Sequence, residues 1–313
     1  MGDRPVVAIA SSPAIDRTVE VDRLRPGGDH RARRAETRAG GKGVNVTRAL
    51  VRCGVPVRLV LAVGGPMGRA LAGLLADEGL PVATVVVRAP TRSSLVMVDP
   101  ETVTIVNDPG ATLDPEEWAR VLGVAAEALE PGGVLTCSGS LPGGLGHEAV
   151  GSLVALARER GAWSLLDSSG AGLRAALAAG ADVVFPNVDE AAAALGRARA
   201  EAEVGEGGTL DEAAELAAAL RAEGAGAAVV SAGAAGTALA EPGGAVIPLP
   251  APEVRVRNPI GAGDCLVAGT AARLREGAPL AEAVRWGVAL AAASCETLTA
   301  GDVDPARARE LLG

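Results

Sequence analysis

The sequence predicts an α/β protein in which helices flank a central, mostly parallel sheet, with a second, small β-sheet beside it. Short apolar runs alternate with amphipathic segments of helical length along most of the 313 residues. Polar or glycine-rich motifs follow several of these runs, as at the carboxyl ends of parallel strands. A period-two stretch at residues 18–22 and a hairpin pattern at residues 95–106 predict the small sheet. We expect one domain over residues 1–313.

The composition excludes several classes of function. Hydrophobic residues make up 49% of the chain and charged residues 21%, which is typical of a globular protein. A net charge of −9 and only 1% aromatic residues argue against a nucleic-acid partner. The apolar runs are too short for a membrane span, and the first residues lack the apolar core of a signal peptide. We therefore expect a cytoplasmic protein without a membrane partner.

Histidine and cysteine are too sparse for the common metal and nucleophile sites. The two histidines, His30 and His147, lie far apart in the sequence, which argues against a histidine metal site or a Ser-His-Asp triad. The four cysteines show no paired spacing, so we expect reduced thiols in the core.

The first elements place a carboxylate at a strand end. Residues 6–11 form an apolar run that suits a buried strand, and Asp16 follows it. Ligands collect at this end of strands in open α/β sheets, so Asp16 is a candidate for binding hydroxyl groups, with a turn aspartate as the alternative. Residues 23–39 are rich in arginine and must lie on a surface, as a solvated face or as the mouth of an anionic-substrate site.

Residues 40–45 read Gly-Gly-Lys-Gly-Val-Asn and open a helix. The spacing differs from that of a P-loop. Gly40 and Gly41 permit close backbone approach, and Lys42 and Asn45 can donate hydrogen bonds, which suits a polyhydroxy ligand. A glycine-rich helix start is the alternative. Lys42 is the only lysine of the chain, which indicates either chance or a place where a compact ammonium serves better than a guanidinium.

The middle of the chain supplies the hairpin and then regular alternation. Arg92 stands just before the hairpin, whose turn reads Asp-Pro-Glu at residues 99–101. A capping box with a proline predicts a helix start at Asp114. Further strands are expected at residues 57–63, 82–87, 134–137, 164–167, 183–185 and 227–231, with a late hairpin at 237–240 and 246–249. Further helices are expected at residues 68–78, 148–160, 173–179, 189–195, 211–223, 265–274 and 280–299, with a last one after Asp304.

Residues 258–264 read Asn-Pro-Ile-Gly-Ala-Gly-Asp and precede a helical pattern. Unpaired N–H groups and the positive end of a helix dipole would meet there and form an anion site. Asp264 lies where that site forms. It is either a helix cap or the carboxylate that accepts a hydroxyl proton during phosphoryl transfer. We expect this loop, Asp16 and the motifs after several strands to share one edge of the sheet.

These motifs together resemble the PfkB carbohydrate kinases of the ribokinase superfamily. Residues 40–45 and 258–264 match the two signatures of that family, and Asn187-x-x-Glu190 resembles its N-x-x-E motif. Residues 12–16, 138–142 and 167–170 resemble the branch that contains 1-phosphofructokinase, tagatose-6-phosphate kinase and the minor 6-phosphofructokinase.

The resemblance implies a ribokinase-like fold with a β-sheet lid, formed by about residues 17–36 and 90–107, that also serves as a homodimer interface. It implies Mg²⁺-dependent transfer of phosphate from ATP to a primary hydroxyl of a sugar phosphate: fructose 1-phosphate, fructose 6-phosphate or tagatose 6-phosphate. By position, Asp264 would be the catalytic base, with an anion hole from Gly261, Ala262 and Gly263. The sugar phosphate would be bound by Asp16, Gly40, Gly41, Lys42, Asn45, Ser140, Arg92 and Arg31. ATP and Mg²⁺ would be bound by Asn187, Ser231, Gly233, Gly236 and, through water, Glu190.

Three departures from the family pattern keep alternatives open. Ser12 replaces a usual asparagine, and Asp29 stands where the minor 6-phosphofructokinases place a lysine near the phosphate, which favours a free sugar or nucleoside as the alternative substrate. Phe185 stands where a lysine commonly faces the nucleotide. An alternative from another class is a non-catalytic sensor of sugar phosphates, although such a protein would not need Asp264, Asn187 and Glu190.

Overall fold

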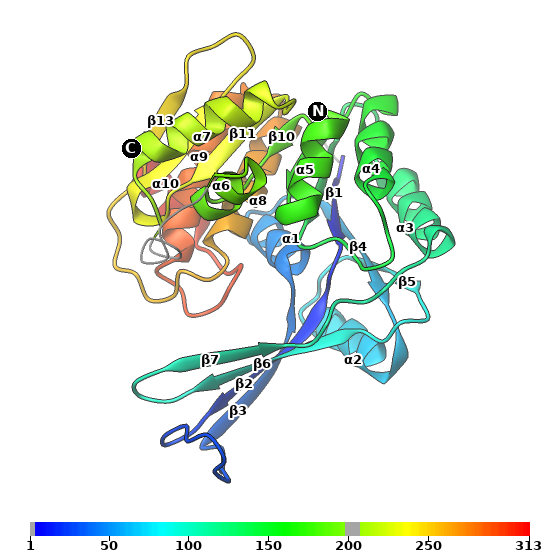
Figure 1. Ribbon diagram of the computed structural model, residues 1–313, viewed down its shortest axis with the longest axis vertical. Coiled ribbons are helices and arrows are strands. Elements are labelled where there is room, and N and C mark those ends of the chain that lie inside the picture. Colours follow the sequence, from blue (N-terminus) through cyan, green and yellow to red (C-terminus); the bar gives the residue numbers. More distant parts are fainter. Residues whose placement is uncertain (1–3, 198–206) are drawn as a thin grey trace.

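A nine-stranded sheet forms the centre of the computed structural model, which describes residues 4–197 and 207–313 (Figure 1). Its strands pair in parallel, except that β12 runs antiparallel to both of its neighbours. This arrangement confirms the predicted mostly parallel sheet. The strands, in spatial order, are β13 (Ile247–Pro250), β12 (Gly236–Ala240), β11 (Ala227–Ser231), β10 (Val183–Val184), β9 (Trp163–Asp167), β8 (Val134–Ser138), β1 (Val6–Ala10), β4 (Val57–Val63) and β5 (Val82–Val86).

Helices cover both faces of this sheet, because alternate side chains of its buried strands point to opposite sides. In β1 all five residues are buried; Val6 and Ala8 join one apolar cluster, and Val7 and Ile9 join the other. The first cluster includes α1 (Lys42–Arg52), α2 (Gly65–Asp77), α8 (Ala262–Arg275), α9 (Leu280–Ser294) and α10 (Pro305–Leu312). The second includes α3 (Pro115–Ala128), α4 (Glu148–Glu159), α5 (Gly170–Ala179), α6 (Val188–Ala194) and α7 (Leu210–Ala222). No helix among the described residues has the length and apolarity to cross a membrane.

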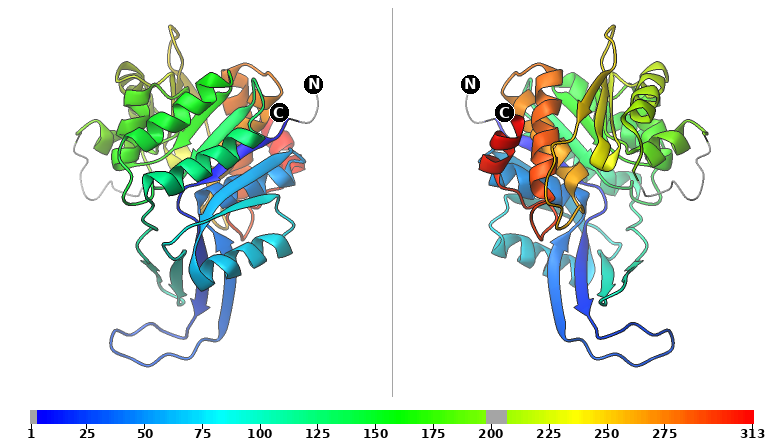
Figure 2. Two further views of the ribbon diagram at one scale, coloured as in Figure 1. Left: turned by 90° about the vertical axis from the view of Figure 1, so that its right-hand side faces the viewer. Right: turned by 90° about the vertical axis from the view of Figure 1, so that its left-hand side faces the viewer.

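A second sheet of four strands projects away from the large one (Figures 1 and 2). We call it the small sheet. Its strands, in spatial order, are β3 (Arg34–Gly40), β2 (Ala14–Glu20), β6 (Arg92–Val98) and β7 (Val103–Asn107). The pairing joins β2 to β6 in parallel and to β3 in an antiparallel ladder. The predicted hairpin is therefore confirmed as β6 and β7.

Strand β3 was not predicted from the residue pattern, which indicated only an arginine-rich surface, although the family resemblance placed residues up to 36 in a β-sheet lid. Its first four residues are exposed, and only its last two are buried. The strand is held by main-chain hydrogen bonds to β2, which do not depend on apolar side chains. Its surface position agrees with the prediction, whereas its regular structure could not be inferred from an apolar pattern.

The predicted helix over residues 280–299 ends early, at Ser294. The Thr297 hydroxyl donates to the Ser294 carbonyl at 2.8 Å, a side-chain bond that competes with the helical ladder. The following residues form a turn-rich loop, 296–302, which we call the C-terminal loop. Arg38 of β3 donates to Thr299 Oγ1 at 2.6 Å, so this loop contacts the small sheet.

Two predictions about helix α3 are confirmed. Asp114 accepts from the Glu117 amide at 2.8 Å, and Glu117 accepts from the Asp114 amide at 3.2 Å, which together form a capping box. Trp118, predicted as a core residue, is buried, and its indole N–H donates to Ser152.

Candidate active site

The polar motifs that follow the strands share one edge of the large sheet. Strands β1, β8 and β9 end in register at Ala10, Ser138 and Asp167. Farther along the same edge, Asn187 and Ser231 form a parallel bridge. The predicted common edge is therefore present, because parallel strands place their carboxyl ends together.

Asp264 is buried at the start of α8, with 5% of its surface exposed. Asn45 of α1 donates its side-chain N–H to Asp264 Oδ2 at 2.8 Å. This partner is a side chain of another helix, so the contact differs from that of an ordinary helix cap. Burial raises the pKa of Asp264 to about 7, and the negative charge of Asp167 adds to this effect. The hydrogen bond from Asn45 and the charge of Lys42 act in the opposite direction.

The backbone at the start of α8 has the form expected of an anion site. Gly261 is the N-cap, with a φ of 89°, and a side chain there would meet Ala300 and Gly301. A Cβ on Gly263 would meet open space, so the first turn is accessible from outside. The Ala262 N–H donates to the Pro259 carbonyl at 3.3 Å. The N–H groups of a first helical turn have no acceptor within the helix, which leaves the start of α8 able to bind an anion.

Lys42, at the start of α1, lies between carboxylates of two other elements. Its Nζ atom is 3.0 Å from Asp167 Oδ1 and 3.9 Å from Glu190 Oε1. Burial disfavours the ammonium, but Asp167 and Glu190 outweigh this effect and raise the pKa of Lys42. Glu190 also forms a capping box with Asn187 at the start of α6, through its other oxygen. One oxygen of Glu190 thus stabilises a helix, and the other faces the site.

Asp16 and the two glycines of the 40–45 segment form one wall of the site. Asp16 lies on β2 and not in a turn, and burial raises the pKa of its carboxyl, while Arg92 and Arg48 oppose this shift. A Cβ on Gly40 would overlap the Asp16 carboxylate, so only glycine leaves the room that this carboxylate occupies. Gly41 has a φ of 108° and packs against the backbone of residues 12–13.

Arg92 is the first residue of β6 and pairs in register with Ala14 of β2. Its Nη2 donates to the Ser12 carbonyl at 3.2 Å, beside the Asp16 strand. Its Nε is buried and has no hydrogen-bond partner among the described residues. A guanidinium at this position could bind a phosphate group through two parallel hydrogen bonds.

The opposite end of the site is formed by strand ends β10 and β11. Ser231 is the last residue of β11, and the next turn contains Gly233 (φ 59°) and Gly236 (φ 117°). A Cβ on Gly236 would lie 2.6 Å from the Ala251 nitrogen, so this turn packs closely on the segment after β13. Phe185 is buried in the core rather than facing this edge, which explains how an apolar residue occupies that position.

Two predicted site residues form no hydrogen bond or ion pair with this group in the part of the chain that the structure describes, and two residues of the group had not been assigned a role. Arg31 is exposed and belongs to the segment between β2 and β3, which lies at the end of the small sheet that is far from the large one (Figure 1), and Ser140 is exposed after β8. Asp167 and Arg48, in contrast, lie within the site: Asp167 pairs with Lys42, and Arg48 donates to Asn45 Oδ1 at 2.9 Å. For Asp167 the sequence offered two signals, its place at a strand end and the resemblance of residues 167–170 to the phosphofructokinase branch, whereas Arg48 carried none.

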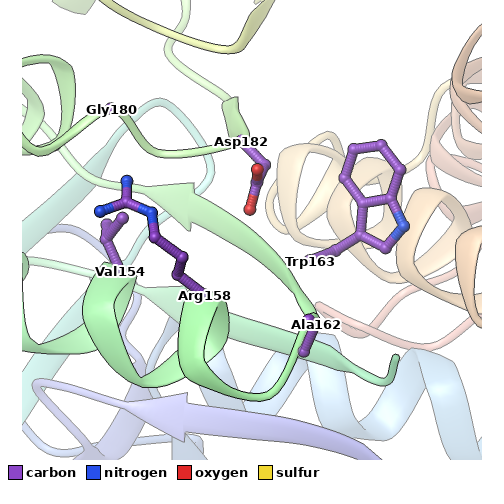
Figure 3. Close-up of a pocket in the computed structure, with 7 residues that line it drawn as sticks. Val154, Arg158, Ala162, Trp163, Gly180 and Asp182 are labelled. Atoms are coloured by element: carbon purple, nitrogen blue, oxygen red, sulfur yellow. The ribbon is translucent and has the colours of Figure 1, made fainter. Parts of the chain in front are cut away.

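A cavity of about 400 Å³ lies elsewhere, at the amino ends of β9 and β10 (Figure 3). Arg158 and Asp182 extend over it, and Trp163 forms one side. Because Trp163 begins β9 and Asp167 ends it, this cavity is at the edge opposite to the assembled motifs. It contains none of the predicted site residues.

Comparison with known proteins identifies the family to which this chain belongs. The profile of the pfkB family carbohydrate kinases matches residues 3–307. The chain belongs to the pfkB family. The 1-phosphofructokinase of Rhodobacter capsulatus is 36% identical over 288 residues, which cover 91% of this chain and 88% of that protein. The ATP-dependent 6-phosphofructokinase isozyme 2 of Escherichia coli is 34% identical over 300 residues, covering 95% and 93%.

Solved structures agree with this membership. The crystal structure of phosphofructokinase-2 from Escherichia coli with potassium has a TM-score of 0.86 and 29% identity, covering 98% of both chains. A ribokinase from Thermotoga maritima has a TM-score of 0.75 at 22% identity over 98% of this chain and 99% of its own, which supports the fold alone. This pfkB protein is therefore a carbohydrate kinase with the predicted ribokinase-like fold.

Proposed function

We propose that this pfkB kinase transfers the γ-phosphoryl group of ATP to a primary hydroxyl of a furanose sugar phosphate. Fructose 1-phosphate, fructose 6-phosphate and tagatose 6-phosphate are the candidates. The observation that carries the proposal is the position of the Arg92 guanidinium, which lies at the base of the small sheet and acts on the pKa of Asp16, so that a group able to bind phosphate stands next to one able to bind hydroxyls. The names of the relatives support it: one is a 1-phosphofructokinase, and a crystal structure of the Escherichia coli phosphofructokinase-2 contains fructose 6-phosphate.

In this proposal Asp264 takes the proton of the attacking hydroxyl. A carboxyl whose pKa is about 7 is close to the ideal for a general base at neutral pH. The positive end of α8 lies beside it and would stabilise negative charge on the transferred phosphoryl group. Lys42 provides a further positive charge, and Asp167 holds its ammonium in place. Under the free-sugar alternative, Arg92 would keep its hydrogen bond to the Ser12 carbonyl but would have no anion to bind.

The residues also fit Mg²⁺ held largely by water and phosphate. No group of three or more potential protein ligands occurs among residues 4–197 and 207–313. Mg²⁺ usually keeps several waters and binds through one or two carboxylates together with substrate phosphates. Glu190, with one oxygen facing Lys42, would hold the ion through water. When bound, Mg²⁺ would neutralise part of the charge on the phosphates.

We further propose that the small sheet is a lid and forms a homodimer interface. Its strands β2 and β6 carry Asp16 and Arg92, so its base is part of the site. Strand β7 exposes Val103, Ile105 and Val106, each at least half accessible. Apolar side chains on an unpaired edge strand favour association with another surface. One structure of the Escherichia coli relative is described as a tetrameric inhibited form, so larger assemblies of such chains also occur.

Asp264→Asn should lower kcat by roughly 10²–10⁴ while the protein folds normally, because it removes a general base. In the wild type, Asp264 is protonated below its pKa and cannot take a proton. Thus kcat/KM should rise with pH through about pH 7, a step that the variant should lack. Steady-state kinetics between pH 5 and pH 9 would test both. Near wild-type turnover in the variant would contradict the assignment.

Arg92→Ala should weaken binding of the phosphorylated sugar by about one to two powers of ten, because hydrogen bonds between charged groups contribute about 1.5–3 kcal/mol. The KM for ATP should barely change, since Arg92 lies at the Asp16 end of the site. The measurement is the KM for each of the three sugar phosphates in the wild type and in Arg92→Ala, with the free sugars fructose and ribose as comparison substrates. Arg88→Ala, an exposed arginine four residues earlier, is the matched control. Wild-type preference for the free sugars would refute the phosphate site.

Glu190→Gln should raise the Mg²⁺ concentration needed for half-maximal activity and leave the KM for the sugar phosphate nearly unchanged. Glutamine can still cap α6, so the helix should persist. Because the ion would be held through water, a partial loss is expected. Glu117→Gln changes the same position of the capping box in α3, away from the site, and serves as control. If both variants respond equally to Mg²⁺, Glu190 is only a capping residue.

Ile105→Asp should shift the protein towards monomers, because a carboxylate would be placed in an apolar contact between small sheets. Sedimentation velocity over a concentration series would measure the masses. Val86→Asp changes an exposed residue on the edge of the large sheet and should leave the assembly unaltered. Identical mass distributions for wild type and Ile105→Asp would exclude this interface.

A further inference from the structure

Arg48 is a buried arginine that lies one helical turn after Asn45 on α1. Only 7% of its side chain is exposed. Glu78 neutralises its charge through two hydrogen bonds, from Nε at 2.8 Å and from Nη2 at 3.0 Å. Such a two-pronged pair fixes both the position and the plane of the guanidinium.

The remaining donors of this fixed guanidinium reach three separate segments. Nη1 donates to Asn45 Oδ1 at 2.9 Å and to the Ala300 carbonyl at 3.1 Å, in the C-terminal loop. Nη2 donates to the Ala39 carbonyl at 3.1 Å, at the end of β3. A single side chain therefore connects α1, the C-terminal loop and the base of the small sheet.

The contact with Asn45 determines which way round its amide lies. A guanidinium has donors and no acceptor, so it can bind the amide only through the amide oxygen. The amide nitrogen is then directed at Asp264 Oδ2, 2.8 Å away. If the amide were reversed, its N–H₂ group would face the N–H group of Arg48, so that two donors would meet. Its oxygen would then face the negatively charged Asp264 carboxylate.

We propose that Arg48 is a positioning residue, which orients the amide of Asn45 so that it donates a hydrogen bond to Asp264. The inference rests on the proposed function, in which Asp264 is the base. A donor on a carboxylate favours its charged form and lowers the pKa of Asp264. The other charged groups that act on this carboxyl are Asp167 of β9, which raises its pKa, and Lys42 of α1, which lowers it. Without Arg48 the amide can rotate, and the pKa of Asp264 should rise.

The test is the pH dependence of kcat/KM for Arg48→Met, with kcat and KM for both substrates. If the pKa of Asp264 rises by about one unit, kcat/KM should fall about five-fold at pH 7 and less than about two-fold at pH 9. The KM for ATP should remain as in the wild type. Arg48→Lys should behave similarly, because an ammonium cannot hold Glu78 and the Asn45 amide with one planar fork.

Arg52→Met is the matched control. Arg52 lies one turn farther along α1, and its Nε is 2.9 Å from Asp302 of the same C-terminal loop. This variant loses an arginine contact to that loop without touching Asn45, so its pH profile should match the wild type. A profile for Arg48→Met that is lowered equally at all pH values would overturn the proposal and leave Arg48 a structural role.

A double variant covers the case in which Arg48→Met does not fold. Arg48→Met/Glu78→Met removes both partners of the pair and leaves no carboxylate without its counterion.

Infrared titration of the ligand-free protein measures the pKa of the Asp264 carboxyl directly, with its band identified by its loss in Asp264→Asn. If Asp264→Asn keeps its turnover, the proposed function fails. The infrared shift still decides on Arg48, and an unshifted band in the Arg48 variant would overturn its role.

Discussion

The close contact between the start of α1 and the end of β1 is the constraint on which the site depends. A Cβ on Gly43 would lie only 2.6 Å from the Ala10 Cα, and one on Gly301 only 2.8 Å from the Asn45 Cα. Glycine at these two positions lets backbone approach the first turn of α1 from both sides. The turn is thereby held against the sheet edge, where Asn45 reaches Asp264 and Lys42 reaches Asp167.

The first turn of α1 places a single ammonium, that of Lys42, among several carboxylates of the site. Asp264 and Asp167 are both buried, and burial raises the pKa of each carboxyl. Lys42 is the ammonium between Asp167 and Glu190, and it also lowers the pKa of Asp264. The compact ammonium of a lysine, on its flexible four-carbon chain, can approach several carboxylates, whereas the planar guanidinium of an arginine is best suited to one. This geometry gives a physical reason for a single lysine in a chain that otherwise uses arginine.

Most of the large sheet could be predicted because its strands are short apolar runs, buried on both faces. The site motifs could be placed because parallel strands bring their ends together, so Asp16, Asn187 and Ser231 needed no knowledge of side-chain contacts. Strand β3 was missed because its order comes from main-chain pairing. Arg48 was missed because its partner Glu78 lies 30 residues away, and nothing in the sequence links the two.

The C-terminal loop connects the small sheet to the first turn of α1, so a movement of one can be transmitted to the other. Thr299 is hydrogen-bonded to Arg38 of the small sheet, Ala300 to Arg48, and Gly301 packs against the backbone of Asn45. Three successive residues thus link the small sheet to the partner of the buried carboxylate. Any tilt of the small sheet that preserves the Arg38–Thr299 bond must also displace the backbone beside Asn45. Motion of the small sheet would therefore be passed on to Asn45, and through Asn45 to the carboxylate that we propose as the proton acceptor.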